Sequence, residues 1–123
     1  MAAPTVLVVD DDPVIVKLLQ VNFEMEGYNV LTANDGEEGL HRARTERPDI
    51  VLLDVMMPKM DGLQVARALK DDPETAPIPV ILLSAKAQAA DVQAGRDVAD
   101  DYITKPFDPL ELLERVSQLL AQL

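Results

Sequence analysis

Acidic, hydroxyl and ammonium side chains follow the apolar runs of this sequence, each close to the point where a run ends. In chain order they are Asp10 and Asp11 after residues 6–9, Asp54 after residues 50–53, Ser84 after residues 80–83, and Lys105 after residues 101–104. Carboxylates of this kind bind hard cations, and an ammonium group pairs with phosphate oxygens. The set therefore predicts a metal-assisted reaction with phosphate.

The carboxylates of Asp10, Asp11 and Asp54 repel one another if the fold brings them together. Each pair about 4 Å apart costs on the order of 4 kcal/mol at an effective dielectric near 20. Either one group takes up a proton or a cation binds. The chain has no cysteine and one histidine, so oxygen ligands must hold the cation, which favours Mg²⁺, with Mn²⁺ as the alternative ion. Asp11 and Asp54 are expected as direct ligands, and Asp10 binds directly or through water.

Asp54 is also the expected nucleophile, because a carboxylate can attack phosphorus and form an acyl phosphate. Lys105 and Ser84 would then pair with phosphoryl oxygens. Each residue has a structural alternative: Asp12 is better explained as a helix cap, and the serine and lysine alone are ordinary turn residues. Their shared position after strands is the observation that favours function.

The elements that must position these side chains alternate along the chain. Strands are expected at residues 6–9, 29–33, 50–53, 80–83 and 101–104. Helices are expected after each strand, at residues 13–26, 37–47, 63–70, 88–95 and 109–123. This pattern predicts an α/β domain of (βα)5 type with a parallel sheet covered on both faces. In such sheets the carboxyl ends of the strands form the ligand site.

Asp-Pro pairs at residues 12–13 and 108–109 mark the starts of the first and last helices. Apolar residues at helical spacing predict the face of each that is turned to the core. For the first helix the face is Ile15, Leu18, Leu19, Asn22 and Met25. For the last it is Leu112, Leu113, Val116, Leu119, Leu120 and Leu123.

The composition limits the class of protein. A length of 123 residues suits one domain spanning 1–123 with no effector domain, and 48% apolar residues suffice for a layered core. The formal net charge of −11 argues against direct contact with nucleic acid or an anionic membrane. No apolar run approaches the roughly 20 residues of a membrane span and no signal peptide is visible, so a cytoplasmic location is expected.

Four segments resemble the response-regulator receiver family of two-component signalling systems, in order and over the whole chain. They are Val8 to Asp11, Leu53 to Gly62, Leu83 to Ala85, and Asp100 to Phe107. The resemblance implies a CheY-like, flavodoxin-like three-layer sandwich with sheet order 2-1-3-4-5. It also implies a signalling switch rather than an enzyme, phosphorylated on Asp54 by a histidine kinase or a histidine phosphotransfer protein.

The resemblance assigns roles to individual residues. Mg²⁺ would be held by Asp10, Asp11, Asp54 and the backbone carbonyl of Met56, and Ser84 and Lys105 would contact the phosphoryl oxygens. Tyr102 would act as an aromatic switch that turns inward when Ser84 moves toward the phosphate. The bond between Lys105 and Pro106 would be cis.

The output face implied by the resemblance consists of the fourth helix, the fifth strand and the fifth helix. This face would contact a downstream protein target. The domain would be a monomer or would form a weak homodimer through the same face. Three residues depart from the family pattern. Ser84 replaces the more frequent threonine, which keeps the hydroxyl and loses a methyl group. Val98 stands where glycine is usual and would be strained if the site needs positive φ. Gly39 should weaken its helix by up to about 1 kcal/mol.

Two other functions compete with this interpretation. A phosphatase or phosphotransferase with an aspartyl nucleophile usually carries a second aspartate two residues after it, where this chain has Met56. A phosphorylation-independent interaction module usually lacks an acidic residue, the lysine or the hydroxyl, and this chain keeps all of them. Turnover of a small phosphate ester would favour the first, and absence of phosphorylation on Asp54 the second.

Overall fold

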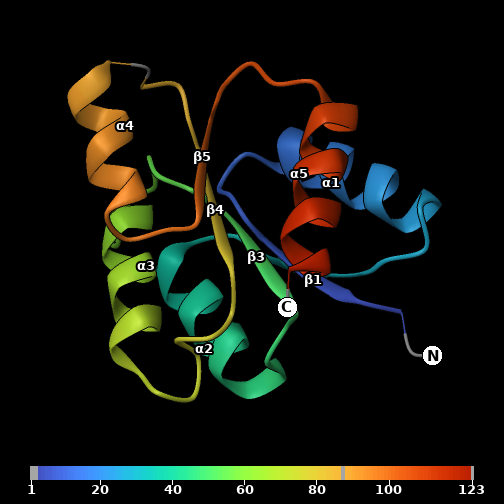
Figure 1. The fold of residues 1–123 in the computed structure, drawn as a ribbon, viewed down its shortest axis with the longest axis horizontal. Coiled ribbons are helices and arrows are strands. Elements are labelled where there is room, and N and C mark those ends of the chain that lie inside the picture. The colour runs from blue at the N-terminus through green and yellow to red at the C-terminus, as the bar shows by residue number, and fades with distance from the viewer. Residues whose placement is uncertain (1–2, 87, 123) are drawn as a thin grey trace.

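The computed structural model describes residues 3–86 and 88–122, which form one parallel sheet with helices on both faces (Figure 1). The strands are β1 (Thr5–Val9), β2 (Asn29–Ala33), β3 (Ile50–Asp54), β4 (Val80–Ser84) and β5 (Asp101–Thr104). The helices are α1 (Pro13–Met25), α2 (Gly36–Glu46), α3 (Gly62–Asp71), α4 (Ala89–Arg96) and α5 (Pro109–Ala121). The sheet order is β2-β1-β3-β4-β5, as the resemblance implied.

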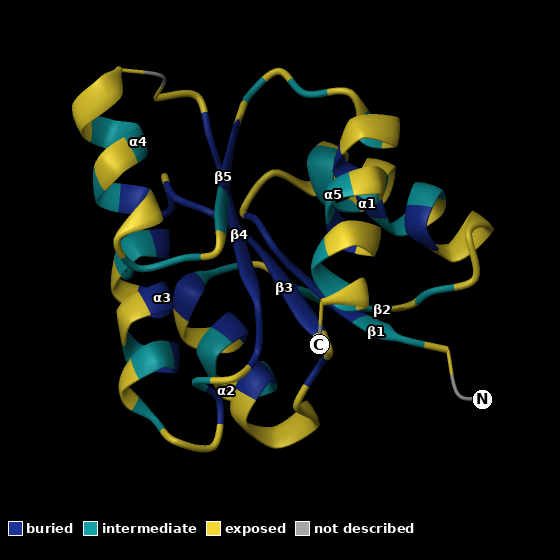
Figure 2. Cartoon of the chain, in the orientation of Figure 1, coloured by how far each residue is buried: buried dark blue, intermediate teal, exposed yellow. Residues whose placement is uncertain are grey.

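Alternate residues of each strand point to opposite faces and build two cores. In β1, Leu7 and Val9 belong to the core beneath α2, α3 and α4, whereas Val6 and Val8 belong to the core beneath α1 and α5. Figure 2 shows the buried strands between helices whose outer surfaces are exposed. All residues of β3 and β4 are buried, which explains why the first four residues of each strand are apolar.

Side-chain caps set the starts of four helices. Asp12 accepts a hydrogen bond from Val14 N at the start of α1, and Asp108 accepts one from Leu110 N at the start of α5. These caps confirm the interpretation of the two Asp-Pro pairs. Asp35 caps α2 in the same way. In α3 the cap is Asp61, which forms a reciprocal capping box with Gln64 that the sequence pattern had not revealed.

The predicted buried face of α1 was partly wrong. Leu19 is buried and Ile15 packs partly against the core, but Leu18 and Met25 are 39% and 80% exposed. Phe23, absent from the predicted face, is fully buried instead. Apolar residues surround most of α1, so periodicity alone did not identify the side that packs on the sheet.

The predicted face of α5 agrees with the structure for the residues that it describes. Leu112 and Val116 are buried, and the other members pack partly buried against the same core: Leu113, Leu119 and Leu120. Leu123 lies outside the described residues. None of the helices in the described part of the chain has the length and apolar character needed to cross a membrane.

Two of the three departures from the family pattern, Val98 and Gly39, have different outcomes. The non-glycine residues with positive φ among those described are Arg47 and Lys59, so Val98 does not carry the strain of a positive φ. Gly39 lies in α2 directly against β1, where an added Cβ would come within 2.7 Å of Cγ1 of Val9. The glycine therefore lets α2 approach the sheet, a benefit that helix propensity alone does not reveal.

Candidate metal and phosphoryl site

Three carboxylates meet at the carboxyl edge of the sheet. Asp10 and Asp11 directly follow β1, and Asp54 is the last residue of the adjacent strand β3. One oxygen from each lies within 4.8 Å of the others. Asp10 and Asp54 are buried, whereas Asp11 is exposed. The cluster contains only oxygen donors and opens to solvent at one residue, which suits a hard, hydrated cation.

Lys105 brings a positive charge to the same edge from the segment after β5. Its Nζ lies 2.9 Å from Oδ2 of Asp10 and 3.3 Å from Oδ1 of Asp54. The lysine therefore bridges the two buried carboxylates, although 95 residues separate it from Asp10 in sequence. Its peptide bond to Pro106 is cis, as the resemblance implied.

Backbone groups orient the two buried carboxylates. The N–H of Asp12 donates to Oδ1 of Asp10 at 2.9 Å, and the N–H of Met56 donates more weakly to Oδ1 of Asp54 at 3.4 Å. Gly62, the first residue of α3, packs against the backbone of Asp54 so closely that a Cβ would come within 2.8 Å of Cα of Val55. Glycine is therefore needed beneath the candidate nucleophile, a contact that sequence reasoning from the residues had missed.

The surroundings of Asp54 favour its neutral form. Burial is the main cause, followed by the negative charge of Asp10, and together they raise the pKa of Asp54 to about 6 even though Lys105 opposes them. For Lys105, burial lowers the pKa, but the hydrogen bonds and charges of Asp10 and Asp54 outweigh it, so the pKa is raised overall. The site holds more negative charge than one ammonium group can balance, which is a reason for it to attract a cation.

Ser84 and Tyr102 lie near this edge but do not contact the carboxylates. Ser84 ends β4, where its buried Oγ accepts a hydrogen bond from Lys86 N at 3.1 Å. The hydroxyl of Tyr102, on β5, donates to the carbonyl of Lys86 at 2.8 Å, and the residue is 7% exposed. Both residues that the resemblance assigns to switching therefore contact the backbone of the same residue.

Met56 follows the strand at the rim, and 53% of its surface is exposed. Its backbone N–H is directed at Asp54, and its side chain is apolar. The predicted residues thus divide into a carboxylate–lysine cluster, made by Asp10, Asp11, Asp54 and Lys105, and a neighbouring set around Lys86 that includes Ser84 and Tyr102.

Comparison with curated proteins finds transcriptional regulators. The alkaline phosphatase synthesis transcriptional regulatory protein PhoP of Bacillus subtilis is 48% identical over 116 residues, covering 94% of this chain and 48% of that protein. The DNA-binding dual master transcriptional regulator RpaA of Synechocystis is 48% identical over 118 residues, covering 95% of this chain and 49% of that protein. The chain thus spans about half the length of these relatives, and the absence of an effector domain stays a prediction.

Solved structures agree with the fold. The chemotaxis protein CheY4 of Vibrio cholerae superposes with a TM-score of 0.89 at 32% identity, covering 95% of this chain and 98% of that one. A response regulator from Chloroflexus aurantiacus gives a TM-score of 0.91 at 35% identity, covering 97% and 98%. The family model for the response regulator receiver domain matches residues 6–117. With the acidic cluster, the lysine and the strand order in place, the chain belongs to the response-regulator receiver family, the signalling modules of two-component systems.

Proposed function

We propose that this receiver domain is a phosphorylation-dependent switch that accepts a phosphoryl group on Asp54. The observation that carries the proposal is the carboxylate–lysine cluster, with three carboxylate oxygens within 4.8 Å of one another and the ammonium of Lys105 between two of them. A structural role alone gives no reason to bury two carboxylates beside a third. The cost of that arrangement is explained if the site binds a cation and a phosphoryl group.

The donor set fits Mg²⁺, with Mn²⁺ as the alternative ion. Asp10, Asp11 and Asp54 would hold it together with the backbone carbonyl of Met56 and water, because Mg²⁺ uses few protein carboxylates and retains part of its hydration shell. When bound, the ion supplies positive charge to a phosphoryl oxygen and to the cluster. It would also favour the ionised form of Asp54, whose pKa lies near 6 without it.

The phosphoryl donor would be a histidine kinase or a histidine phosphotransfer protein. An oxygen of Asp54 forms a bond to phosphorus while the bond from phosphorus to the donor nitrogen breaks, which leaves an acyl phosphate on Asp54 and an imidazole on the donor. Lys105 balances charge on the phosphoryl oxygens as its ammonium leaves Asp54. The Oγ of Ser84 accepts a hydrogen bond from Lys86 N, and its O–H can donate to a phosphoryl oxygen when the residue moves toward the phosphate.

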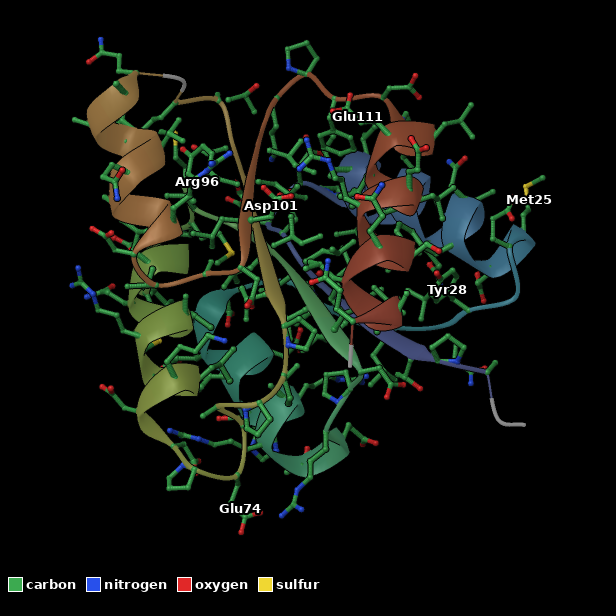
Figure 3. All side chains as sticks on the ribbon, in the orientation of Figure 1. Met25, Tyr28, Glu74, Arg96, Asp101 and Glu111 are labelled. Carbon is green, nitrogen blue, oxygen red and sulfur yellow. The ribbon has the colours of Figure 1, made fainter. Side chains whose placement is uncertain are left out.

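The conformational response would reach the face formed by α4, β5 and α5. A charged cluster lies there, in which Arg96 and Arg115 both pair with Asp101. Figure 3 labels Arg96 and Asp101 of this cluster. These residues line or border a groove of about 340 Å³ that also includes Glu111. We propose that this face contacts a downstream protein target or a second copy of the domain. The relatives are DNA-binding or transcriptional regulators by name, but the acidic receiver itself would not contact nucleic acid.

The proposal is tested by incubating the protein with acetyl phosphate and Mg²⁺ and following phosphorylation on a phosphate-trapping gel. We expect a shifted band that disappears in Asp54→Asn and in the presence of EDTA. Asp71→Asn removes an exposed aspartate of α3 and should leave the shift intact. A shift that persists in Asp54→Asn would disprove the assignment of the acceptor. No shift under any condition would favour the phosphorylation-independent module, and multiple turnover of a phosphate ester would favour the enzyme.

A further inference from the structure

The Tyr102 ring occupies a space that one residue of α4 leaves open. Tyr102 pairs with Leu82 across β4 and β5, and its ring lies between the sheet and α4 in the core beneath that helix. Gly95 is the buried residue of α4 above the ring. A Cβ built on Gly95 would overlap Cδ2 of the ring, would lie 2.7 Å from Cε2, and would come within 3.2 Å of Leu82.

This glycine is unfavourable for the helix that contains it. Glycine in a helix interior costs about 1 kcal/mol relative to alanine. Helix α4 is also short, with eight residues, and its N-cap residue Gln88 makes no side-chain capping hydrogen bond. This short helix without a side-chain cap thus carries an unfavourable residue at its one buried position. The close approach of the ring and of Leu82 to Gly95 is a packing gain that can offset this cost.

We propose that Gly95 holds Tyr102 inward, with its ring beneath α4 and its hydroxyl on the carbonyl of Lys86. The size of the side chain at position 95 then sets the resting balance of the switch. A methyl group at this position displaces the ring, and with it the hydrogen bond from the hydroxyl to Lys86. Because Lys86 N also donates to Ser84, a displaced ring alters the segment that holds the phosphoryl-binding hydroxyl.

The coupling to phosphorylation rests on the proposed function, whereas the position of the ring does not. Coupling between two sites is reciprocal. If phosphorylation favours the inward ring by a given factor, a residue that expels the ring must weaken the binding of a phosphoryl analogue by that factor. Gly95 would therefore be a positioning residue of the switch, acting through Tyr102 rather than on phosphate.

The first experiment follows the ring in the unphosphorylated protein. In a Tyr28→Phe background Tyr102 is the sole tyrosine and the chain has no tryptophan, so tyrosine fluorescence reports on Tyr102 alone. Gly95→Ala should increase acrylamide quenching and remove the NMR contacts between the ring and Leu82. Gln93→Ala, at an exposed position of the same helix, should change neither. An unchanged ring in Gly95→Ala would overturn the proposal.

The second experiment separates the ring contact from helix propensity. Gly95→Ala should raise the unfolding midpoint in a Tyr102→Ala background, where no ring opposes the methyl group, and should raise it less or lower it when Tyr102 is present. Equal stabilisation in both backgrounds would contradict the proposal. This cycle also remains informative if Gly95→Ala alone is too unstable for spectroscopy.

The third experiment titrates beryllofluoride with Mg²⁺ as the phosphoryl analogue. Gly95→Ala should bind it about fivefold more weakly or worse than the unmodified chain, at the lower end of usual coupling factors. Equal affinity would overturn the coupling of Gly95 to the switch. Failure of the unmodified chain to bind beryllofluoride would count instead against the proposed function, and the ring measurements would still decide the role of Gly95.

Discussion

At the scale of single residues, the site is defined by an excess of buried negative charge. Asp10 and Asp54 share the ammonium of Lys105, and the exposed Asp11 adds a third carboxylate within reach. Burial and the charge of Asp10 together raise the pKa of Asp54 to about 6. An ionised Asp54 is therefore destabilising in the metal-free fold, as expected for a group retained for function.

Replacing Asp54 with asparagine should stabilise the metal-free protein at neutral pH. Below pH 3.8 the carboxyl is protonated in both the folded and unfolded states, so it carries no penalty. Between pH 3.8 and about 6 the unfolded chain ionises first, and the stability of the native protein falls as the pH rises. Above about pH 6 the ionised carboxylate lowers the free energy of unfolding by its full amount. Asp54→Asn should therefore raise the free energy of unfolding by on the order of 2 kcal/mol.

Urea denaturation in EDTA at pH 4.5 and pH 7.5 checks this prediction. The gain in unfolding free energy should be larger at the higher pH, and Asp71→Asn should give no comparable gain at either. A gain of equal size at both pH values, or a loss at pH 7.5, would show that the surroundings do not disfavour the ionised form.

Met56 should make the acyl phosphate long-lived. The residue stands two positions after Asp54, is 53% exposed, and offers no side-chain group that could orient an attacking water. Met56→Asn places a carboxamide there and should shorten the lifetime severalfold, measured as loss of label after the donor is removed. Met25→Asn, at an exposed site on α1, is the matched control. Identical decay of the Met56→Asn and native proteins would exclude this role.

At the scale of elements, close contacts at glycines matter as much as periodicity does. Gly39 brings α2 against Val9, and Gly62 starts α3 against the backbone of Asp54. Strand ends and the Asp-Pro caps of α1 and α5 could be predicted because each depends on residues adjacent in sequence, and the alternation of strands and helices predicted the parallel sheet. The buried face of α1 and the contacts of these glycines could not be predicted, because they depend on segments distant in sequence.

Gly39→Ala should destabilise the fold although alanine is the better helix former. The new methyl group would lie 2.7 Å from Val9 in the core, and such overpacking costs about 1–3 kcal/mol, more than the gain of about 1 kcal/mol in helix propensity. Thermal denaturation should show a lower midpoint, restored in part by Val9→Ala. His41→Ala, at an exposed position of α2, serves as the control. A higher midpoint in Gly39→Ala would refute the close contact.

The outer face of α1 should serve the approach of a protein donor. Its exposed apolar residues recur at helical spacing, from Val14 near the start of α1 to Met25 at its end (Figure 3 labels Met25), and they are Val14, Leu18, Val21 and Met25. Polar replacement of Val14 and Leu18 together should slow phosphotransfer from a histidine kinase by about tenfold, the effect of losing about 1.4 kcal/mol of contact. Acetyl phosphate, which needs no docking surface, should phosphorylate both proteins at equal rates. Equal slowing with both donors would place the effect in the site instead.

At the scale of the whole molecule, two separate cores position one functional edge. The core beneath α2, α3 and α4 contains Tyr102, and the core beneath α1 and α5 lies on the opposite face of the same strands. A change at the carboxyl edge can therefore reach α4 through a single strand, β5. The sequence predicted this edge from the polar residue that ends each apolar run. The set around Lys86 could not be predicted from the sequence. Ser84 and Tyr102 contact the main chain of Lys86, and a residue of any type could offer those main-chain groups.

The most direct measurement is the site of phosphorylation itself. The protein is incubated with acetyl phosphate and either Mg²⁺ or EDTA, reduced with borohydride to convert an acyl phosphate into a stable alcohol, and sequenced by mass spectrometry. We predict a single modified residue, Asp54, present with Mg²⁺ and absent with EDTA. Modification of another residue, or equal modification of Asp54 without a divalent cation, would contradict the proposed mechanism.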